Sequence, residues 1–333
     1  LYSVLYMPTL SLTNSMAFAH LKNIDSEWPR VRVMGTFGWI AASWLFPMIW
    51  LQSNLEFQVL PPFFVGTEVA DATSRLGDTL KVSGIISIFY ALYCMSLPNT
   101  PPNRQASERL AFMKAFSLLS KKSFAVLVFA SLPIAIIHQI YFMQTGPFLE
   151  NQLGLLVTYI APAMTVGQFA EIAVMAILGM FIARFGFRRT IAIGAFAYFA
   201  RYLIWGLISL QEPSGPSVDV SGQFIWTVPL VVGIFSQLLH GVCYACFFAS
   251  AYMYVDKIAD DDIRNSAQTV FGIIILGLGP MLAAPLLGFL ANIFGDAGVV
   301  TDFAGMWLSL AAIAFITSAV FFVAFTEEAE SSM

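Results

Sequence analysis

An acid and an amide stand three residues apart in the middle of a long apolar stretch. Glu171 follows Gln168 within residues 159–181, a run long enough to cross a bilayer as a helix. This spacing puts both side chains on one helical face. Because a carboxylate at membrane depth costs about 3 kcal/mol on insertion scales, it normally faces a protein interior or a wet cavity. The pair therefore predicts a polar cavity in which an amide and an acid bind a solute.

Two roles are open for Glu171. A carboxyl group shielded from water can pick up a proton near neutral pH, and it would then couple proton entry to solute binding. The alternative is a structural ion pair with Arg201, the only basic residue deep in an apolar stretch. Such a pair does not exclude function, because carboxylates of transporters often have basic partners. Glu171 and Arg201 are therefore the candidates for proton coupling.

Polar and aromatic residues also share one face in the stretch 33–52 and just before it. Arg32, Thr36 and Trp39 are spaced four and three residues apart, so they lie on one side of a helix. Arg32 either anchors the helix to lipid headgroups or turns inward. In the second case Trp39 offers a flat surface on which a ring can stack.

A third group occupies the segment IAIIHQIYFMQ in the stretch 123–148. It contains His138, Gln139 and Tyr141, and Gln144 ends it. Polar side chains in membrane helices often only hold helices together. Four of them within seven residues are denser than that role requires, so they favour the lining of a cavity.

His240 and Tyr244 are one helical turn apart, and Gly241 between them allows a close approach of two backbones. Packing and a role in a site both remain open for this pair. Cys243 and Cys246 lie beside it in the same apolar run. Thiols in such a run indicate small buried side chains, not a disulfide or a zinc site. No metal and no cofactor is predicted.

The composition determines what kind of scaffold holds these residues. The chain has 333 residues, of which 58% are hydrophobic and 11% are charged. A soluble domain of this composition could not cover its surface, so the chain is predicted to be an all-α polytopic membrane protein. Nine apolar stretches have about the length of a membrane span, at 1–20, 33–52, 81–97, 123–148, 157–183, 190–210, 224–254, 267–294 and 303–325.

Basic residues are distributed unevenly over the connections between these stretches. If residues 21–32 are cytoplasmic, that side of the membrane holds 13 Lys and Arg, and the other side holds only Arg75 and Lys81. This positive-inside bias supports the order of the spans and predicts a cytoplasmic C-terminus.

The longest basic connection divides the chain. Residues 98–122 begin with prolines and then predict an amphipathic helix on the membrane surface. Three spans precede this connection and six follow it, and the chain begins at Leu1 inside an apolar run, so three helices are expected to be missing in front. The predicted parts are 1–97 (helices 4–6 of an N-terminal bundle), 98–122 (the loop between bundles), 123–326 (helices 7–12) and 327–333 (a cytoplasmic tail).

Two six-helix bundles with a substrate between them are the major facilitator arrangement. The connection GMFIARFGFRR at 179–189 resembles the short cytoplasmic turn of that superfamily. Four motifs in order, YMPTLSLTNSMAF (6–18), PRVRVMGTFGWI (29–40), GQFAEI (167–172) and IRNSAQTVFG (263–272), resemble its nucleoside:proton symporter family, most closely the bacterial nucleoside permeases. The resemblance covers essentially the whole chain.

This resemblance implies a transporter and not an enzyme. It implies proton-coupled import of nucleosides by alternating access, in a monomer of the bacterial inner membrane that binds no nucleic acid. The positions that it implies as substrate-lining are Arg32, Thr36, Trp39, Gln139, Gln168, Glu171, His240 and Tyr244.

The chain departs from the family pattern at several of these places. Trp39 and Tyr244 stand where phenylalanine is expected, and His240 stands where tyrosine is expected, so each position keeps a ring. Phe142 replaces an asparagine and loses a hydrogen-bonding group. Ala245 falls where members commonly have an aspartate, which leaves coupling to Glu171.

The missing acid keeps another polar solute open, such as a sugar or a modified nucleoside. A membrane-bound enzyme or a sensor that does not transport is the alternative from another class. His20-x-x-x-x-Asp25 matches an acyltransferase pattern, but it lies at a helix end and the sequence offers no convincing second catalytic group.

Overall fold

The computed structural model describes residues 24–99, 118–219, 222–259 and 264–327, together with positions 9, 13, 16, 17, 20 and 21. The predicted stretch 1–20 and the surface helix predicted within 98–122 therefore lie largely outside the described residues. Of the helices in the described part, six are long and apolar enough to cross a membrane: Val33–Leu51, Lys122–Gln152, Val157–Ile208, Val228–Ile258, Ala267–Ile293 and Phe303–Ala324.

The longest of these helices contains two predicted spans. Helix α7 (Val157–Ile208) consists of two helical arms that meet at a kink, where Gly186 has a non-helical, left-handed backbone with φ of 74°. A left-handed residue changes the direction of a helix, and glycine adopts this conformation without a steric cost. The predicted stretches 157–183 and 190–210 are thus the two arms of α7. The short stretch 81–97 is also helical, as α4 (Asp78–Cys94), and the all-α prediction is confirmed.

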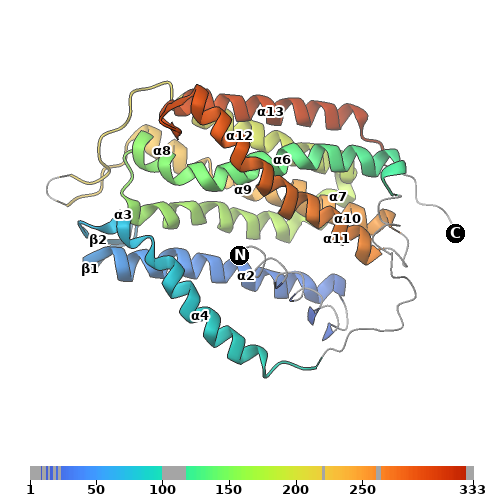
Figure 1. Cartoon of the computed structure of the whole chain (residues 1–333), viewed down its shortest axis with the longest axis horizontal. Coiled ribbons are helices and arrows are strands. Elements are labelled where there is room, and N and C mark those ends of the chain that lie inside the picture. Colours follow the sequence, from blue (N-terminus) through green and yellow to red (C-terminus); the bar gives the residue numbers. More distant parts are fainter. Residues whose placement is uncertain are drawn as a thin grey trace.

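The second half of the chain packs around one hydrophobic core. Figure 1 shows its helices running side by side. They are η2 (Leu118–Ser120), α6 (Lys122–Pro147), η3 (Phe148–Gln152), α7, α8 (Val228–Phe235), α9 (Leu238–Val242), η4 (Cys243–Ala249), α10 (Ser250–Ile258), α11 (Arg264–Gly272), η5 (Ile273–Leu278), α12 (Gly279–Ile293) and α13 (Phe303–Ala324). A small hairpin of β3 (Gly295–Asp296) and β4 (Val299–Val300) joins α12 to α13.

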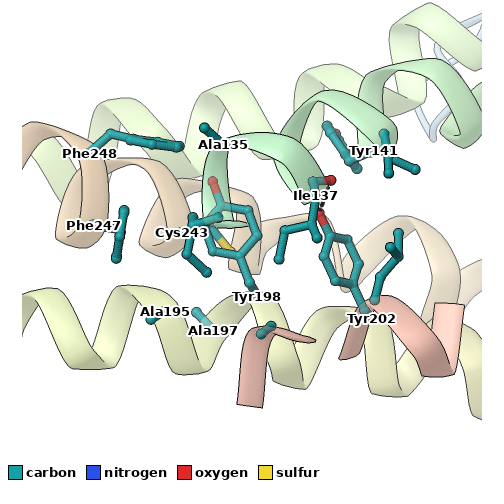
Figure 2. Packing of buried hydrophobic residues seen from close by; sticks show 14 of the residues in the cluster. Ala135, Ile137, Tyr141, Ala195, Ala197, Tyr198, Tyr202, Cys243, Phe247 and Phe248 are labelled. Atoms are coloured by element: carbon teal, nitrogen blue, oxygen red, sulfur yellow. Dashed lines mark hydrogen bonds between the residues drawn. The ribbon is translucent and has the colours of Figure 1, made fainter. Parts of the chain in front are cut away.

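Large rings fill the middle of this core. Trp205 on the second arm of α7 and Trp307 on α13 meet with ring centroids 4.7 Å apart, and both side chains are fully buried. Tyr202 stacks on Trp307 from the same arm. Figure 2 shows how the neighbouring residues of α6, α7 and η4 interlock. Aromatic side chains of this size dominate the burial of apolar area, so they fix how the helices pack.

The first half of the described chain touches this core along one helix. Helix α2 (Ile24–Phe46) continues into the π-helical turn η1 (Pro47–Leu51) and lies alongside α7, whereas α4 runs away from the other helices (Figure 1). None of the residues of α4 is buried. Its exposed side chains include many isoleucine, leucine and aromatic residues.

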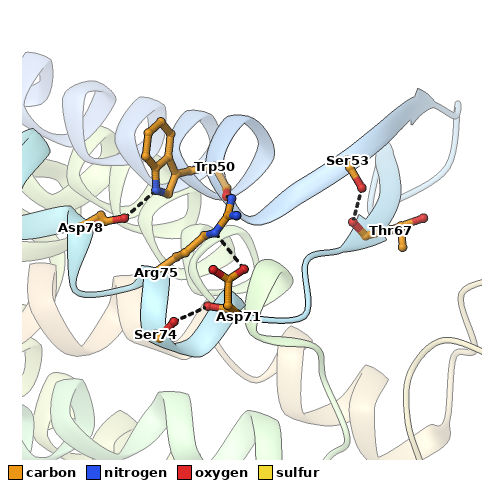
Figure 3. A network of polar contacts seen from close by, with 7 residues as sticks. All are labelled: Trp50, Ser53, Thr67, Asp71, Ser74, Arg75 and Asp78. Atoms are coloured by element: carbon orange, nitrogen blue, oxygen red, sulfur yellow. Dashed lines mark hydrogen bonds and ion pairs between the residues drawn. The ribbon is translucent and has the colours of Figure 1, made fainter.

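A polar network holds the connection between α2 and α4 (Figure 3). This connection contains the antiparallel strands β1 (Gln52–Phe57) and β2 (Phe64–Glu68), followed by α3 (Ala72–Arg75). Arg75 forms an ion pair with Asp71 and donates to the Trp50 carbonyl, and the Trp50 indole donates to Asp78 at 2.9 Å. Hydrogen bonds from Lys81 and Trp50 hold the pKa of Asp78 below its usual value.

Candidate functional site

Two glycines bring α9 against the first arm of α7. A side-chain carbon added to Gly241 would lie 2.3 Å from the backbone of Ala170 and 2.4 Å from the Glu171 nitrogen. One added to Gly167 would lie 2.9 Å from the His240 side chain. The close approach inferred from Gly241 is therefore present, and it places His240 beside the turn that carries Gln168 and Glu171.

Replacing Gly241 with alanine is expected to destabilise the bundle, because the methyl group would meet backbone atoms that cannot move alone. Overpacking of this kind costs about 1–3 kcal/mol. Thermal unfolding of the purified protein in detergent measures the effect. Gly179→Ala on the same arm of α7 is the matched control, since nothing lies within 4 Å of its added carbon. Equal melting temperatures for the two variants would contradict this account of the helix contact.

Helix α2 runs antiparallel to the first arm of α7. The Trp44 indole donates to the Thr165 hydroxyl at 3.0 Å, and beyond the end of α2 the side chain of Leu51 in η1 packs with Val157. The later of the two residues in the first segment contacts the earlier residue in α7, so the two contacts fix an antiparallel register. Earlier residues of α2 therefore meet later residues of α7. Thr36 and Trp39 therefore lie at the depth of Gln168 and Glu171.

The acid and amide are enclosed by packed helices. Gln168 and Glu171 retain 8% exposure each, and Thr36 retains 6%. The two pockets described in the structure, of about 330 and 280 Å³, are lined by other residues. Gln144, predicted to line a cavity, lines the first of these pockets, between α6 and α12. Neither of these two pockets is the cavity predicted around Glu171.

Four rings from α6 and α9 meet at this level, and we call His138, Tyr141, Phe142 and His240 the ring cluster. The His240 ring stacks on Tyr141 with centroids 5.0 Å apart and on His138 at 5.6 Å. Phe142 packs edge-on against His240 at 6.0 Å. The density of polar residues in the segment 134–144 predicted the lining of a cavity, and two of them, His138 and Tyr141, are in the cluster.

The ring cluster connects α2 with η4. Trp39 packs edge-on against Phe142 with centroids 6.0 Å apart, and Tyr244 lies 6.3 Å from the His138 ring. Trp39 keeps 47% of its surface exposed, so one side of its indole remains accessible. Residues that lie far apart in the chain are thereby joined in one aromatic site.

Arg201 lies wholly inside the protein, beneath the ring cluster. Its Nη1 donates to His240 Nδ1 at 2.8 Å, and its Nη2 donates to the Tyr202 hydroxyl at 3.2 Å. The guanidinium carbon lies 4.1 Å from the centre of the Tyr141 ring. Such stacking of a cation on a ring is favourable when water is excluded. These partners are imidazole and aromatic groups, and none of them is a carboxylate.

Several residues of this site escaped the sequence analysis. Tyr198 bonds His138 Nδ1 through its hydroxyl at 2.8 Å, and Gln237 accepts from the Tyr141 hydroxyl at 2.9 Å. The spacing of Tyr198, Arg201, Tyr202 and Trp205 along α7 marks one helical face and could have revealed them. Gln237 carries no such signal.

The remaining predicted residues are placed as follows. Gln139 is half-buried on α6 next to His138. The side chain of Arg32 lies outside the described residues, as does that of Asp25 in the acyltransferase-like pattern. His20 is exposed, and its ring bonds the Met16 carbonyl.

The helix that carries His240 is irregular just beyond it. The segment η4 is π-helical, and it contains Tyr244 together with Ala245, Cys243 and Cys246. Segments of this kind occur frequently at functional sites. Both thiols are free, and a search of the described residues finds no group of ligands for a metal ion.

Comparison with known proteins gives one family. The model of the family described as nucleoside H+ symporter matches residues 1–330. YegT of Escherichia coli (strain K12), which carries the name of a nucleoside transporter, is 31% identical over 342 residues that cover 100% of this chain and 72% of YegT. The xanthosine permease of the same strain is 24% identical, and the match covers 96% of this chain and 71% of the permease.

Solved structures show the same fold. The crystal structure of a mutant form of the nucleoside transporter NupG matches with a TM-score of 0.74 at 22% identity, covering 96% of this chain and 74% of that one. A second NupG crystal structure gives a TM-score of 0.65 at 20% identity and covers 97% and 74%. The helices described above are therefore arranged as in a multi-pass membrane transporter.

Proposed function

We propose that this chain, which belongs to the nucleoside H+ symporter family, imports nucleosides together with protons by alternating access. The observation that carries the proposal is the buried pair Gln168 and Glu171, which lies at the depth of Thr36 and Trp39 on the neighbouring helix. A buried acid and amide beside accessible rings suit a solute that has both a polar and a flat aromatic part.

Each group of residues takes one part of this solute. Trp39 and Tyr244 stack on the base, as flat side chains do with planar ligands. Arg32, Gln139 and Gln168 hold ribose hydroxyls and base edges, and Thr36 lines the same side. Glu171 exchanges the proton and contacts the nucleoside. The two helical parts then rock around this fixed site, so that the site opens to each side of the membrane in turn.

The burial of Glu171 fits this proposal as one stage of a cycle. A transporter must enclose its site at some point, because a site open to both sides would leak. The proposal also includes three expectations from the sequence. The chain is divided at 98–122 into two bundles, and it works as a single subunit. It lies in an inner membrane, with the C-terminus and the basic connections facing the cytoplasm. It contains no enzymatic step.

Uptake of labelled uridine into proteoliposomes tests the function directly. An inward proton gradient should drive accumulation of uridine above the outside concentration, and a protonophore should reduce the accumulation ratio to about one, since it removes the driving force. Empty liposomes are the control. Uridine uptake that ignores the gradient would contradict symport, and absence of binding and uptake for all nucleosides would contradict the substrate class.

One residue, Ala245, favours a second class of solute. Ala245 is fully buried in η4, next to Tyr244, and it supplies no acid there. A site with one acid could bind another small polar solute, such as a sugar. Competition of unlabelled sugars and modified nucleosides against labelled uridine separates the two classes.

A further inference from the structure

Arg201 and His240 form a buried pair with a defined direction of hydrogen bonding. A guanidinium has only donors and stays charged in proteins. Its Nη1 lies 2.8 Å from His240 Nδ1, so this ring nitrogen must be the acceptor. A neutral imidazole that accepts at Nδ1 carries its proton at Nε2. Nε2 of His240, on the opposite edge of the ring from Arg201, is therefore an N–H donor.

The guanidinium is itself fixed in place. The Tyr202 hydroxyl donates to the Ile137 carbonyl at 2.9 Å (Figure 2). Its oxygen lone pairs therefore remain to accept from Arg201 Nη2. The ring of Tyr141 covers one face of the guanidinium at 4.1 Å. A cation held on three sides has little freedom, so it imposes one ring orientation and one tautomer on His240.

The His240 ring lies beside the proposed substrate site and is itself only 1% exposed, so a substrate reaches its donor when the packing around it opens. The glycine contacts described above hold its backbone against the turn of α7 with Gln168 and Glu171, and its ring belongs to the cluster that reaches Trp39 through Phe142. A base stacked on Trp39 would lie with its edge toward this cluster. A fixed N–H donor at that edge distinguishes bases that carry a carbonyl oxygen from bases that lack one.

We propose that Arg201 is a positioning residue that fixes His240 as the N–H donor to a carbonyl oxygen of the nucleobase. The inference rests on the proposed function, and it deepens it by naming the feature of the substrate that is read. Arg201 and His240 then set specificity, and neither of them carries the transported proton. Glu171 carries the transported proton.

Binding of two matched nucleoside pairs to the purified protein tests this inference. Inosine carries a carbonyl oxygen that purine riboside lacks, and uridine carries one that the riboside of pyrimidin-2-one lacks. The unaltered protein should bind the carbonyl-bearing member of at least one pair about tenfold more tightly, the effect of one hydrogen bond. Arg201→Met should remove most of this preference, whereas Arg201→Lys, which keeps a charged donor, should retain part of it.

A second substitution separates positioning from general stability. An asparagine side chain always offers an N–H donor and has no tautomers. His240→Asn should keep the preference, and adding Arg201→Met to it should change the preference by less than about twofold. Where Arg201→Met does not yield a monodisperse protein, Tyr202→Phe replaces it, because it removes the hydroxyl that orients the guanidinium. It should reduce the preference about threefold.

The outcomes are distinct. Equal loss of affinity for both members of a pair, or an unchanged preference in Arg201→Met and in Tyr202→Phe, overturns the role of Arg201 while leaving nucleoside transport intact. The role is also overturned if Arg201→Met reduces the preference equally in the protein with His240 and in the His240→Asn variant. Failure of the unaltered protein to bind any nucleoside would instead remove the proposed function.

Discussion

Replacing Glu171 with glutamine should abolish accumulation of nucleoside driven by a proton gradient, while exchange of nucleoside between the two sides of the membrane continues. Glutamine keeps the shape and one acceptor oxygen of the side chain, but it cannot bind and release a proton. Glu171 is the only acidic residue of α7. Glu150 and Asp256 stand near the ends of their helices, so they cannot take over the central position.

The size of the effect follows from the bonds that an ionised acid makes. A hydrogen bond to a charged group contributes about 1.5–3 kcal/mol. Losing one is expected to lower the initial rate of gradient-driven uptake about tenfold or more. The accumulation ratio of labelled uridine should fall to about one in proteoliposomes with an inward proton gradient. Counterflow of labelled uridine, measured without a gradient, should persist.

Glu150→Gln is the matched control, since it removes a carboxylate from the exposed end of η3 and leaves the buried site unchanged. Its uptake should match that of the unaltered protein. Undiminished gradient-driven uptake in Glu171→Gln would remove Glu171 from coupling. In that case the family resemblance and the fold would still stand, but the role of the acid would have to be assigned to another group.

The chain's local patterns predict its helices well and its long-range contacts poorly. Apolar length alone located both arms of α7, but only the structure shows that they meet at a kink at Gly186. The spacing of Gln168 and Glu171 placed both on one face, and both are buried. Periodicity reports the face of a helix and carries no information about the opposite helix.

Arg201 illustrates this limit. A single basic residue in an apolar stretch indicates a buried partner, and an acid was the natural candidate. The partner that the structure provides is His240, whose position depends on the close approach at Gly241 and on the stacking of Tyr141. Such an arrangement depends on three helices at once. Gln144 was predicted to line a cavity and does line a pocket, but its partner in that pocket, α12, could not be read from its own helix.

Replacing Glu68 with glutamine should loosen the contact between the β1–β2 hairpin and the first turn of α7. Oε2 of Glu68 accepts from the Thr158 backbone nitrogen at 2.9 Å and from its hydroxyl at 2.7 Å. Leu156, at the N-cap of α7, provides no side-chain bond to this helix end. A carboxylate there is favourable because it satisfies free N–H groups and meets the positive end of the helix dipole.

This contact is one of the links that hold the first half of the described chain to the second. Leu51, Ala72 and Val157 form a small apolar cluster beside it. If the two halves rock apart at this end during transport, the bonds of Glu68 must break in each cycle. Glutamine keeps one acceptor oxygen but loses the charge that meets the helix dipole, which contributes about 0.3–1 kcal/mol, so Glu68→Gln should raise the population of the open state up to about fivefold.

Labelling of a cysteine introduced at Ala72 measures this population. Ala72 is almost completely buried in the contact, so a thiol there reacts with a membrane-impermeant maleimide only when the contact opens. Cys94, which is exposed, is first replaced by serine. Glu68→Gln should increase the labelling rate, and Glu56→Gln on the same hairpin, which is exposed, should not. Equal rates in the two variants would mean that this contact holds the hairpin in place and takes no part in opening the site.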